Sequence, residues 1–199
     1  MFTGIVQAIG KVTAVEAGGR MARMRVTAPA LDCADVATGD SIAVNGVCLT
    51  VTRLDGQEFS FDVSEETLSV TAGFDVGNAV NLEKSLRLAD RLGGHLVSGH
   101  VDAVGEVVAV EAVDGNRVLT CRFPPELAPY FARKGSVTVN GVSLTVNTVN
   151  ADRFSVNLIP HTLSVTNLNT LAAGSRVNLE VDLVARYVER MLGSKGEAS

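Results

Sequence analysis

Apolar and polar residues alternate along much of the chain with the period of two that is typical of a β-strand with one buried face. Residues 47–51 show this most clearly, because the first, third and fifth are Val, Leu and Val, whereas Cys48 and Thr50 lie between them. The Asn-Gly pair directly before this run is a turn signal. We therefore predict a turn followed by a strand, with Cys48 and Thr50 on its outer face, roughly 7 Å apart at about 3.3 Å per residue.

The same alternation predicts about six short strands in the first half of the chain. They lie near residues 4–15, 21–28, 40–53, 58–64 and 79–84, with 67–71 as a further short piece. Glycines at 18–19, 56 and 73 predict turns between them, at the spacing of antiparallel hairpins. So many short strands in so small a unit favour a closed Greek-key barrel, because closure removes exposed strand edges.

The chain repeats itself at an offset of 95 residues. Residues 45–51 return as 140–146 with only Cys48 changed to Ser143, and residues 67–71 return as 162–166 without a mismatch. Further matches join 4–10 to 99–105, 14–17 to 109–112 and, after a shift of two residues, 80–83 to 177–180. Two long repeats indicate a tandem duplication, since a solenoid needs several shorter units.

We therefore predict an all-β protein of two tandem six-stranded Greek-key β-barrels with a short C-terminal helix. The expected boundaries are 1–86 for the N-terminal barrel, 87–95 for a linker, 96–182 for the C-terminal barrel, 183–193 for the helix and 194–199 for a tail. Residues 31–36 and 124–132 are candidates for short helices at matching positions, and 86–92 is a weaker candidate in the linker.

The tail helix is predicted from Asp182, a candidate cap, and from apolar residues that recur at helical spacing until Gly193. A helix of about 11 residues is too short to be stable alone in water. Its apolar face must therefore pack on its own barrel or on copies from other subunits.

Composition narrows the function. The chain is 46% hydrophobic and 20% charged, as expected of a globular protein, and its net charge of −5 without a basic block argues against a nucleic-acid surface. No run of 18 apolar residues predicts a membrane span, and the first residues already belong to a repeat, so no signal peptide is expected. Three cysteines without CxxC spacing predict neither a disulfide scaffold nor a zinc site, and favour the cytoplasm.

The two halves differ where chemistry is possible. His100 replaces Ile5, Ser143 replaces Cys48, His161 replaces Glu66, and Lys134 precedes the position where Gly135 replaces Asp40. Each residue also has an ordinary structural interpretation, since barrel histidines and strand serines are commonly structural and a lone cysteine acts as a small hydrophobe. His95 and His100 have no carboxylate or thiolate at ligand spacing, so no metal site is predicted. The asymmetry suggests two similar ligands in different roles.

Five motifs taken together resemble the riboflavin synthase alpha-chain family. They are residues 1–6, 45–51, 93–102, 140–146 and 159–163, and the resemblance covers essentially the whole chain. It implies a transferase that uses neither cofactor nor metal, in which one 6,7-dimethyl-8-ribityllumazine donates a four-carbon unit to a second. The products would be riboflavin and 5-amino-6-ribitylamino-uracil. Each half would bind one lumazine, so that an active site forms between the N-terminal barrel of one subunit and the C-terminal barrel of its neighbour in a homotrimer, with the tail helices at its centre.

The resemblance also implies particular site residues. The N-terminal lumazine site would use Gly4, Ile5, Val6, Cys48, Leu49, Thr50, Asp62, Val63, Ser64, Glu65, Glu66 and Thr67. The C-terminal site would use Gly99, His100, Val101, Lys134, Ser143, Leu144, Thr145, Leu158, Ile159, Pro160, His161, Thr162 and Leu163. Turnover would depend most on Phe2, Cys48, His100, Ser143, Thr145 and Asp182. Asn140 and His161 stand where some relatives carry Asp and Glu, from which we expect changed hydrogen bonds to the ligand but retained activity.

The implied chemistry suits these residue types. The C7 methyl of the lumazine loses a proton to give a stabilised carbanion, for which His100 is a suitable base or proton shuttle. Ser143 and Cys48 are candidates for a nucleophile or proton donor, and Lys134 for an anchor of a carbonyl or a ribityl hydroxyl. Holding two rings in register replaces a bimolecular encounter and supplies much of the acceleration.

Two alternatives have other functions. The lumazine proteins of luminous bacteria keep the barrels as a non-enzymatic optical antenna but have lost polar residues of the catalytic set, whereas this chain keeps Cys48, His100 and Ser143. A barrel that binds lipid or oligosaccharide would not explain an asymmetric duplication.

Overall fold

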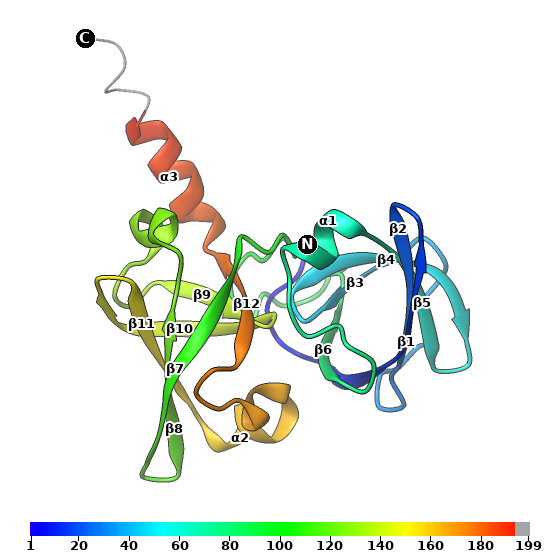
Figure 1. The fold of residues 1–199 in the computed structure, drawn as a ribbon, viewed down its shortest axis with the longest axis horizontal. Helices are drawn as coiled ribbons and strands as arrows, with labels where there is room; N and C mark the ends of the chain where they lie inside the picture. The colour runs from blue at the N-terminus through cyan, green and yellow to red at the C-terminus, as the bar shows by residue number, and fades with distance from the viewer. Residues whose placement is uncertain (194–199) are drawn as a thin grey trace.

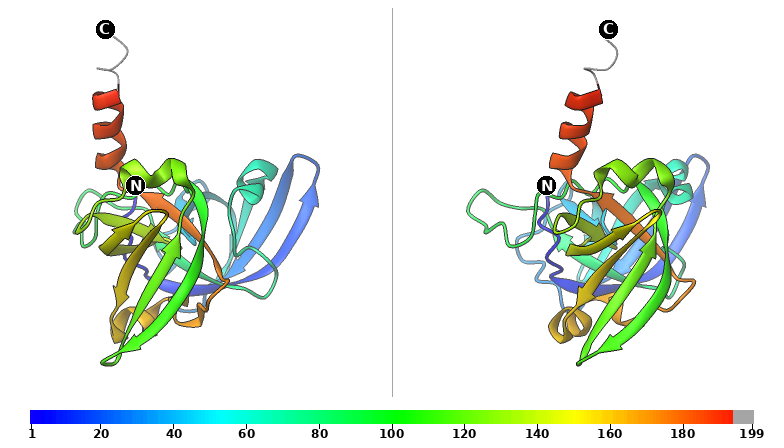
Figure 2. Two further views of the ribbon diagram at one scale, coloured as in Figure 1. Left: turned by 60° about the vertical axis from the view of Figure 1, so that its left-hand side comes forward. Right: turned by 90° about the vertical axis from the view of Figure 1, so that its left-hand side faces the viewer.

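Two closed antiparallel barrels lie side by side in the computed structural model, which describes residues 1–193, and a C-terminal helix projects away from them (Figures 1 and 2). The first barrel consists of β1 (Ala8–Gly18), β2 (Met21–Thr27), β3 (Ser41–Val44), β4 (Val47–Asp55), β5 (Glu58–Ser64) and β6 (Ala79–Lys84). Around the barrel the strands follow the order β1-β2-β5-β4-β3-β6, and β6 pairs with β1 to close it.

The second barrel repeats this order strand for strand. Its strands are β7 (Ala103–Val113), β8 (Asn116–Arg122), β9 (Ser136–Val139), β10 (Val142–Asn150), β11 (Arg153–Leu158) and β12 (Arg176–Val181). β7 pairs with β8 and β12, as β1 pairs with β2 and β6, and β10 lies between β9 and β11. The prediction of two six-stranded barrels is therefore confirmed.

Each barrel is filled by the apolar positions of the alternating pattern. Val47, Leu49 and Val51 are buried in the first core, whereas Cys48 is half-buried and Thr50 is exposed. The matching run in β10 shows the same alternation, with Ser143 half-buried and Thr145 exposed. The strand faces predicted from the period of two are thus confirmed in both halves.

The two Asn-Gly turns meet where the barrels touch. Asn45 and Gly46 have φ values of 47° and 82°, and Asn140 and Gly141 have 48° and 76°, which is the left-handed pair that a type I′ hairpin requires. A Cβ placed on Gly46 would lie 2.8 Å from the Gly141 nitrogen, and one on Gly141 would lie 2.7 Å from the Gly46 nitrogen. Glycine is therefore needed at both positions for conformation and for contact.

Buried asparagines join the barrels around this contact. The Asn81 side chain donates to the Asn140 carbonyl, and the Asn178 side chain donates to the Asn45 carbonyl, both at 3.0 Å. Asn167 adds a bond from its side chain to Asn45 Oδ1 at 2.9 Å. Since an unpaired buried amide costs about 1–3 kcal/mol, these bonds fix how one barrel sits on the other.

Three strand predictions need correction. The expected strand at 40–53 is two strands, β3 and β4, separated by the Asn-Gly turn, and the strand expected from residue 4 begins only at Ala8. Residues 67–71 are not a strand, because they lie in and just after the helix α1 (Glu65–Ser69). Ser64 caps this helix by accepting from the Thr67 N–H at 3.0 Å, which outweighs the strand propensity of the β-branched residues.

Two of the three short-helix predictions were wrong. Residues 31–36 form successive turns, in which the Asp32 carboxylate accepts from the Ala34 N–H, and in 86–92 the Asp90 carboxylate accepts from the Arg87 N–H to close a turn. The third, at 124–132, is the 3-10 helix η1 (Pro125–Tyr130), because Pro129 inside it has no N–H for an α-helical ladder.

The remaining helices are α2 (Pro160–Val165), η2 (Asn167–Thr170) and the tail helix α3 (Leu183–Gly193). Asp182 caps α3 through its carboxylate, which accepts from the Val184 N–H at 2.9 Å, so the predicted helix and its cap are confirmed. Val184, Tyr187, Val188, Met191 and Leu192 are all exposed. The predicted tail at 194–199 lies outside the described residues. Among residues 1–193, no helix has the length and apolar character to cross a membrane.

Candidate functional site

Two crossing segments, residues 2–6 and 97–101, each contact the barrel formed by the other half of the chain. Phe2 forms an antiparallel bridge with Val97, so the N-terminal segment runs beside the residues that directly follow the linker. From there the Gly4 carbonyl accepts from the Ser143 N–H of the second barrel at 2.8 Å. The Gly99 carbonyl accepts from the Cys48 N–H of the first barrel, also at 2.8 Å. The repeated motif lies in β4 and β10, and each of these two strands is thus bordered by a segment from the other half of the chain.

This exchange corrects the grouping expected from the sequence. Gly4, Ile5 and Val6 were assigned to the N-terminal site, but Gly4 contacts Ser143 and Val6 packs against the second core. Gly99, His100 and Val101 were assigned to the C-terminal site, but Gly99 contacts Cys48 and Val101 packs against the first core. The offset of the repeat reveals which residues correspond, not which barrel they contact.

Both barrels open at the same place in their walls. The ladder between β4 and β5 runs from Asp55↔Glu58 to Val51↔Phe61, and residues 47–50 and 62–64 lie beyond its end. The ladder between β10 and β11 ends likewise at Val146↔Val156, with residues 142–145 and 157–158 beyond it. Peptide groups at such an opening are strong donors and acceptors, suited to a planar ring with amide-like edges. The predicted site residues that lie beyond the ends of these ladders are 48–50 and 62–64 in the first barrel and 143–145 and 158 in the second.

At the first opening, the Cys48 side chain packs against the small apolar cluster of Phe2, Ala43 and Val97. Cys48 is half-buried against Phe2, which is itself completely buried, and Thr50, Asp62 and His100 are exposed. Asp62 pairs with Arg23 at 3.1 Å. Of the other residues expected here, Leu49 and Val63 belong to the core, Ser64 and Thr67 form the cap of α1, and Glu65 and Glu66 are exposed in its first turn. Leu49 and Val63 can therefore offer a ligand their backbone groups only.

The second opening holds a pair of side chains that the first lacks. Ser143 Oγ lies 2.7 Å from His95 Nδ1. Burial lowers the pKa of His95, although the charge of Asp182 opposes this shift, so the imidazole is neutral near pH 7 and can accept the hydroxyl proton in a hydrogen bond. His95 Nε2 is buried and has no hydrogen-bond partner among residues 1–193. This pair is an arrangement that can activate a hydroxyl or pass on a proton.

His95 is the functional candidate that sequence comparison missed. It was considered only as a metal ligand, because it lies in the linker and has no partner in the repeat. A Cβ on the preceding Gly94 would lie 2.8 Å from Ser143 Oγ and 2.1 Å from the Thr3 carbonyl oxygen. The Gly-Gly-His sequence was therefore the available signal, since glycine is needed for His95 to approach Ser143 so closely.

The other residues predicted for the C-terminal site take different positions. Lys134 has a left-handed φ of 69°, and its N–H donates to the Val146 carbonyl at 2.7 Å, leaving its side chain exposed. His161 is exposed in α2, where Pro160 occupies the first turn. Thr145 and Ile159 are exposed, Thr162 and Leu163 are half-buried, and Leu144 and Leu158 lie in the core.

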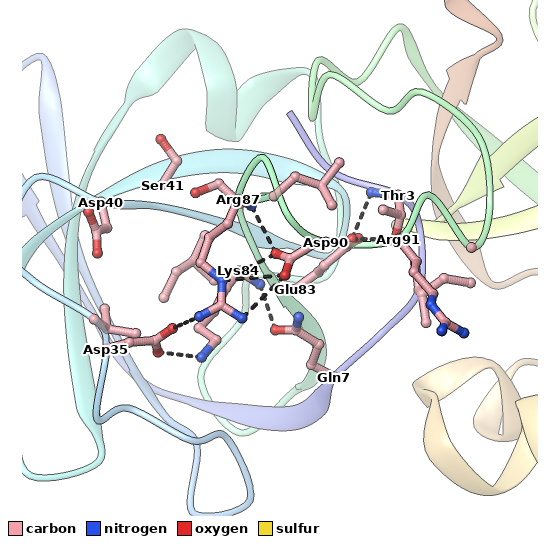
Figure 3. A pocket seen from close by; sticks show the side chains of 16 residues that line it. Thr3, Gln7, Asp35, Asp40, Ser41, Glu83, Lys84, Arg87, Asp90 and Arg91 are labelled. Carbon is pink, nitrogen blue, oxygen red and sulfur yellow. Dashed lines mark hydrogen bonds and ion pairs between the residues drawn. The ribbon is translucent and has the colours of Figure 1, made fainter.

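A cavity of about 500 Å³ lies beside the first barrel, between β3, β6 and the linker (Figure 3). Lys84 and Arg87 both pair with Asp35, at 2.5 and 3.3 Å, and Arg87 also pairs with Asp90 at 3.2 Å. Ile5 lines this cavity, but Cys48, His100 and Ser143 do not. Its charges neutralise one another, so we place the chemistry at the two barrel openings instead.

Cys33, Cys48 and Cys121 are all free thiols, and burial raises the pKa of Cys121 to about 12, which makes it unreactive. Within residues 1–193, no cluster of three or more His, Cys, Asp or Glu side chains is arranged to hold a metal ion.

Comparison with known families finds the lumazine binding domain twice, at residues 3–85 and 98–182. The chain is 49% identical over 203 residues to a riboflavin synthase of Mycobacterium tuberculosis, which covers 98% of this chain and 100% of that protein. It is 47% identical over 194 residues to a riboflavin synthase of Photobacterium phosphoreum, covering 96% and 89%.

Solved structures give the same fold. A crystal structure of LumP complexed with riboflavin matches with a TM-score of 0.83 and 30% identity, covering 91% of this chain and 99% of LumP. A complex of LumP with 6,7-dimethyl-8-(1'-D-ribityl) lumazine matches with a TM-score of 0.81 and 29% identity over the same shares.

Proposed function

This chain belongs to the riboflavin synthase family of duplicated lumazine-binding domains, and we propose that it converts two 6,7-dimethyl-8-ribityllumazine molecules into riboflavin and 5-amino-6-ribitylamino-uracil. The reaction is a four-carbon transfer, which makes the protein a transferase. The observation that carries this proposal is the pair of matching wall openings with different chemical equipment, Cys48 at one and the Ser143–His95 pair at the other. Two copies of one substrate that act as donor and acceptor require this combination of shared shape and distinct chemistry.

The proposed roles follow from where the side chains lie. The half-buried Cys48 thiol and the exposed His100 face the first lumazine, and the exchange of segments brings Val101 to the same barrel. Ser143, held by neutral His95, faces the second lumazine as a hydroxyl donor or nucleophile. Thr145 and Lys134 are exposed beside it and bind polar atoms of the ring or ribityl chain.

Phe2 and Asp182 act through other residues. Phe2 is completely buried against Cys48 and Val97, so it holds the thiol and the crossing segments in place. Asp182 caps α3, and its charge also acts on His95. Both positions support the expectation that turnover depends on these two residues without requiring contact with the substrate.

We propose further that three subunits assemble through α3 in the cytoplasm. Five large apolar residues of this helix are 48–69% exposed in the single chain, a surface that other copies of the helix would cover. Pairing the first opening of one subunit with the second opening of its neighbour would then bring two lumazines face to face. Three free cysteines suit a reducing compartment.

A lumazine-binding antenna is the second candidate, because the solved complexes with lumazine and riboflavin are of LumP. Incubating the purified protein with 6,7-dimethyl-8-ribityllumazine and recording riboflavin absorbance separates the two. The proposed enzyme forms riboflavin and consumes two lumazines for each one formed. Tight binding of lumazine without riboflavin formation would reject the enzyme in favour of the antenna.

A further inference from the structure

Two buried glutamates hold the crossing segments. Glu83 at the end of β6 and Glu180 at the end of β12 are 5% and 2% exposed, and they occupy matching positions of the repeat. Neither forms an ion pair within residues 1–193, and burial raises the pKa of both carboxyl groups against the opposing effect of their hydrogen bonds. A buried carboxylate without a cation is costly, so the bonds that it accepts must be retained.

Glu83 accepts three hydrogen bonds from the N-terminal segment. Its Oε1 accepts from the Thr3 N–H at 2.7 Å and from the Thr3 hydroxyl at 2.6 Å (Figure 3). Its Oε2 accepts from the Gly4 N–H at 2.9 Å. The Gly4 carbonyl then accepts from the Ser143 N–H of the second barrel. A carboxylate of the first barrel therefore sets the position of the segment that borders the second opening.

Glu180 makes the same bonds in the opposite direction. Its Oε1 accepts from the Ser98 N–H at 2.7 Å and from the Ser98 hydroxyl at 2.6 Å, and its Oε2 accepts from the Gly99 N–H at 3.0 Å. The Gly99 carbonyl accepts from the Cys48 N–H of the first barrel. Each opening is thus bordered by a segment that is anchored to the other barrel.

We propose that Glu83 and Glu180 are positioning residues that act crosswise, Glu83 on the Ser143 opening and Glu180 on the Cys48 opening. The meaning of these openings as two lumazine sites rests on the proposed function, but the crosswise anchoring itself does not. Ile5 and His100 directly follow the anchored glycines, so the carboxylates also fix the side chains that differ most between the halves.

Glu83→Gln and Glu180→Gln test this with little change in volume. A glutamine has one acceptor oxygen and a donor NH₂ group, so at least one of the three N–H or O–H donors of the segment would face another donor. The crossing segment would then be held less firmly at Gly4 or Gly99. The hydrogen bond that the carbonyl of this glycine accepts, from the Ser143 N–H or the Cys48 N–H respectively, would open more often.

The measurement is amide hydrogen exchange, resolved by residue with NMR, on the full chain without ligand. We expect Glu83→Gln to speed exchange of the Ser143 amide by about ten- to a hundredfold and to change the Cys48 amide much less. Glu180→Gln should do the reverse. The matched controls are Glu58→Gln in the first barrel and Glu106→Gln in the second, two partly exposed glutamates that pair with Arg25 and Arg122, and neither variant should change either amide.

Faster exchange at the amide of the same barrel, or equal change at both amides, would overturn the proposal, as would no change at either. If a glutamine variant fails to fold, Thr3→Val and Ser98→Ala each remove one hydroxyl donor to the glutamate and should give the same crosswise pattern at smaller amplitude. Thr3→Val also removes the hydroxyl that accepts from the Ile5 N–H, so Ser98→Ala is the cleaner of the two. Because exchange needs no substrate, it can succeed even if the parent protein forms no riboflavin. That second result would reject the proposed function and leave the anchoring intact.

Discussion

The two openings are alike in their backbone and unlike in their side chains. In both, a glycine carbonyl of a crossing segment accepts from the N–H of the central residue at 2.8 Å, and a buried glutamate holds that segment. Yet the Ser143 hydroxyl is hydrogen-bonded to His95, whereas the Cys48 thiol makes no hydrogen bond within residues 1–193. The comparison teaches that the duplication kept the backbone of the two openings and changed the side chains beside it, as the proposed pair of lumazine sites with different reactivity would need.

Ser143 and His100 give the largest expected effect on this comparison. Ser143→Ala or His100→Ala should lower kcat by about 10²–10⁴-fold, because each removes a group proposed to move a proton, while lumazine affinity changes only a few-fold. Steady-state rates and a lumazine titration measure the two quantities. Ser175→Ala, on an exposed loop, is the control. Equal losses in turnover and affinity would make Ser143 and His100 binding groups alone.

The contact between the Asn-Gly turns should show the next largest effect. Gly46→Ala and Gly141→Ala each force a side chain against the facing backbone, and we expect each to lower the free energy of unfolding by at least about 2 kcal/mol, measured by urea denaturation. Gly56→Ala and Gly115→Ala are the controls, because both have positive φ but no atom near the added Cβ. Their cost of about 1 kcal/mol reports backbone strain only. Unequal losses of stability at Gly46 and Gly141 would show that the two turns do not contribute equally to the contact between the barrels.

Asn167 breaks that symmetry and offers a smaller effect. Its counterpart in the first half is Ala72, whose backbone N–H donates to Asn178 Oδ1 at 2.7 Å. Asn167→Ala should lower the free energy of unfolding by about 1–2 kcal/mol, because the Ala79 carbonyl and Asn45 Oδ1 each lose a buried donor. Asn169→Ala in the same helix is exposed and should stay within about 0.5 kcal/mol of the parent. An unchanged stability in Asn167→Ala would show that the junction tolerates the symmetric form.

The pH dependence of stability gives the smallest effect. In the folded protein the pKa of His95 lies below its ordinary value of 6.5. As the pH falls below 6.5, the His95 imidazole therefore takes up a proton in the unfolded chain but stays neutral in the folded protein. His95 therefore does not reduce the free energy of unfolding above pH 6.5. Between pH 6.5 and the lowered pKa, this free energy falls as the pH falls, by at most about 1.4 kcal/mol per pH unit.

Urea denaturation of the parent and of His95→Gln at pH 7.5, 6.5 and 5.5 measures this, and the variant should lose less stability over the acid step. A steeper loss in the variant would contradict a neutral, buried His95.

Alternation and repetition were enough to predict the barrels, because the period of two fixes which face of a strand is buried and the offset of 95 fixes that it happens twice. They were not enough for residues 67–71, where one capping serine decided for a helix. They also could not reveal the crossing segments, since a short stretch without periodicity carries no information about which barrel it contacts.

The candidate site was predictable where the two halves could be compared. The substitution of Ser143 for Cys48 drew attention to a strand that does border an opening in the barrel wall. His95 lies in the linker, and so subtraction of the halves could not detect it. Glu83 and Glu180 occupy matching positions, so comparison of the halves could not detect them either. Their proposed positioning role follows only from the hydrogen bonds that they accept from the crossing segments.

The exchanged segments bear on the ancestry of the protein. A single repeat that exchanged such an arm with an identical copy would form a two-fold homodimer, and the bonds from Gly4 to Ser143 and from Gly99 to Cys48 are the two halves of that symmetric contact. In a homodimer both openings carry the same residues, and one substitution changes both at once. Fusion into one chain releases each arm and each strand to mutate separately. The covalent joining of the copies, more than any single residue, is what permits a division of labour between them.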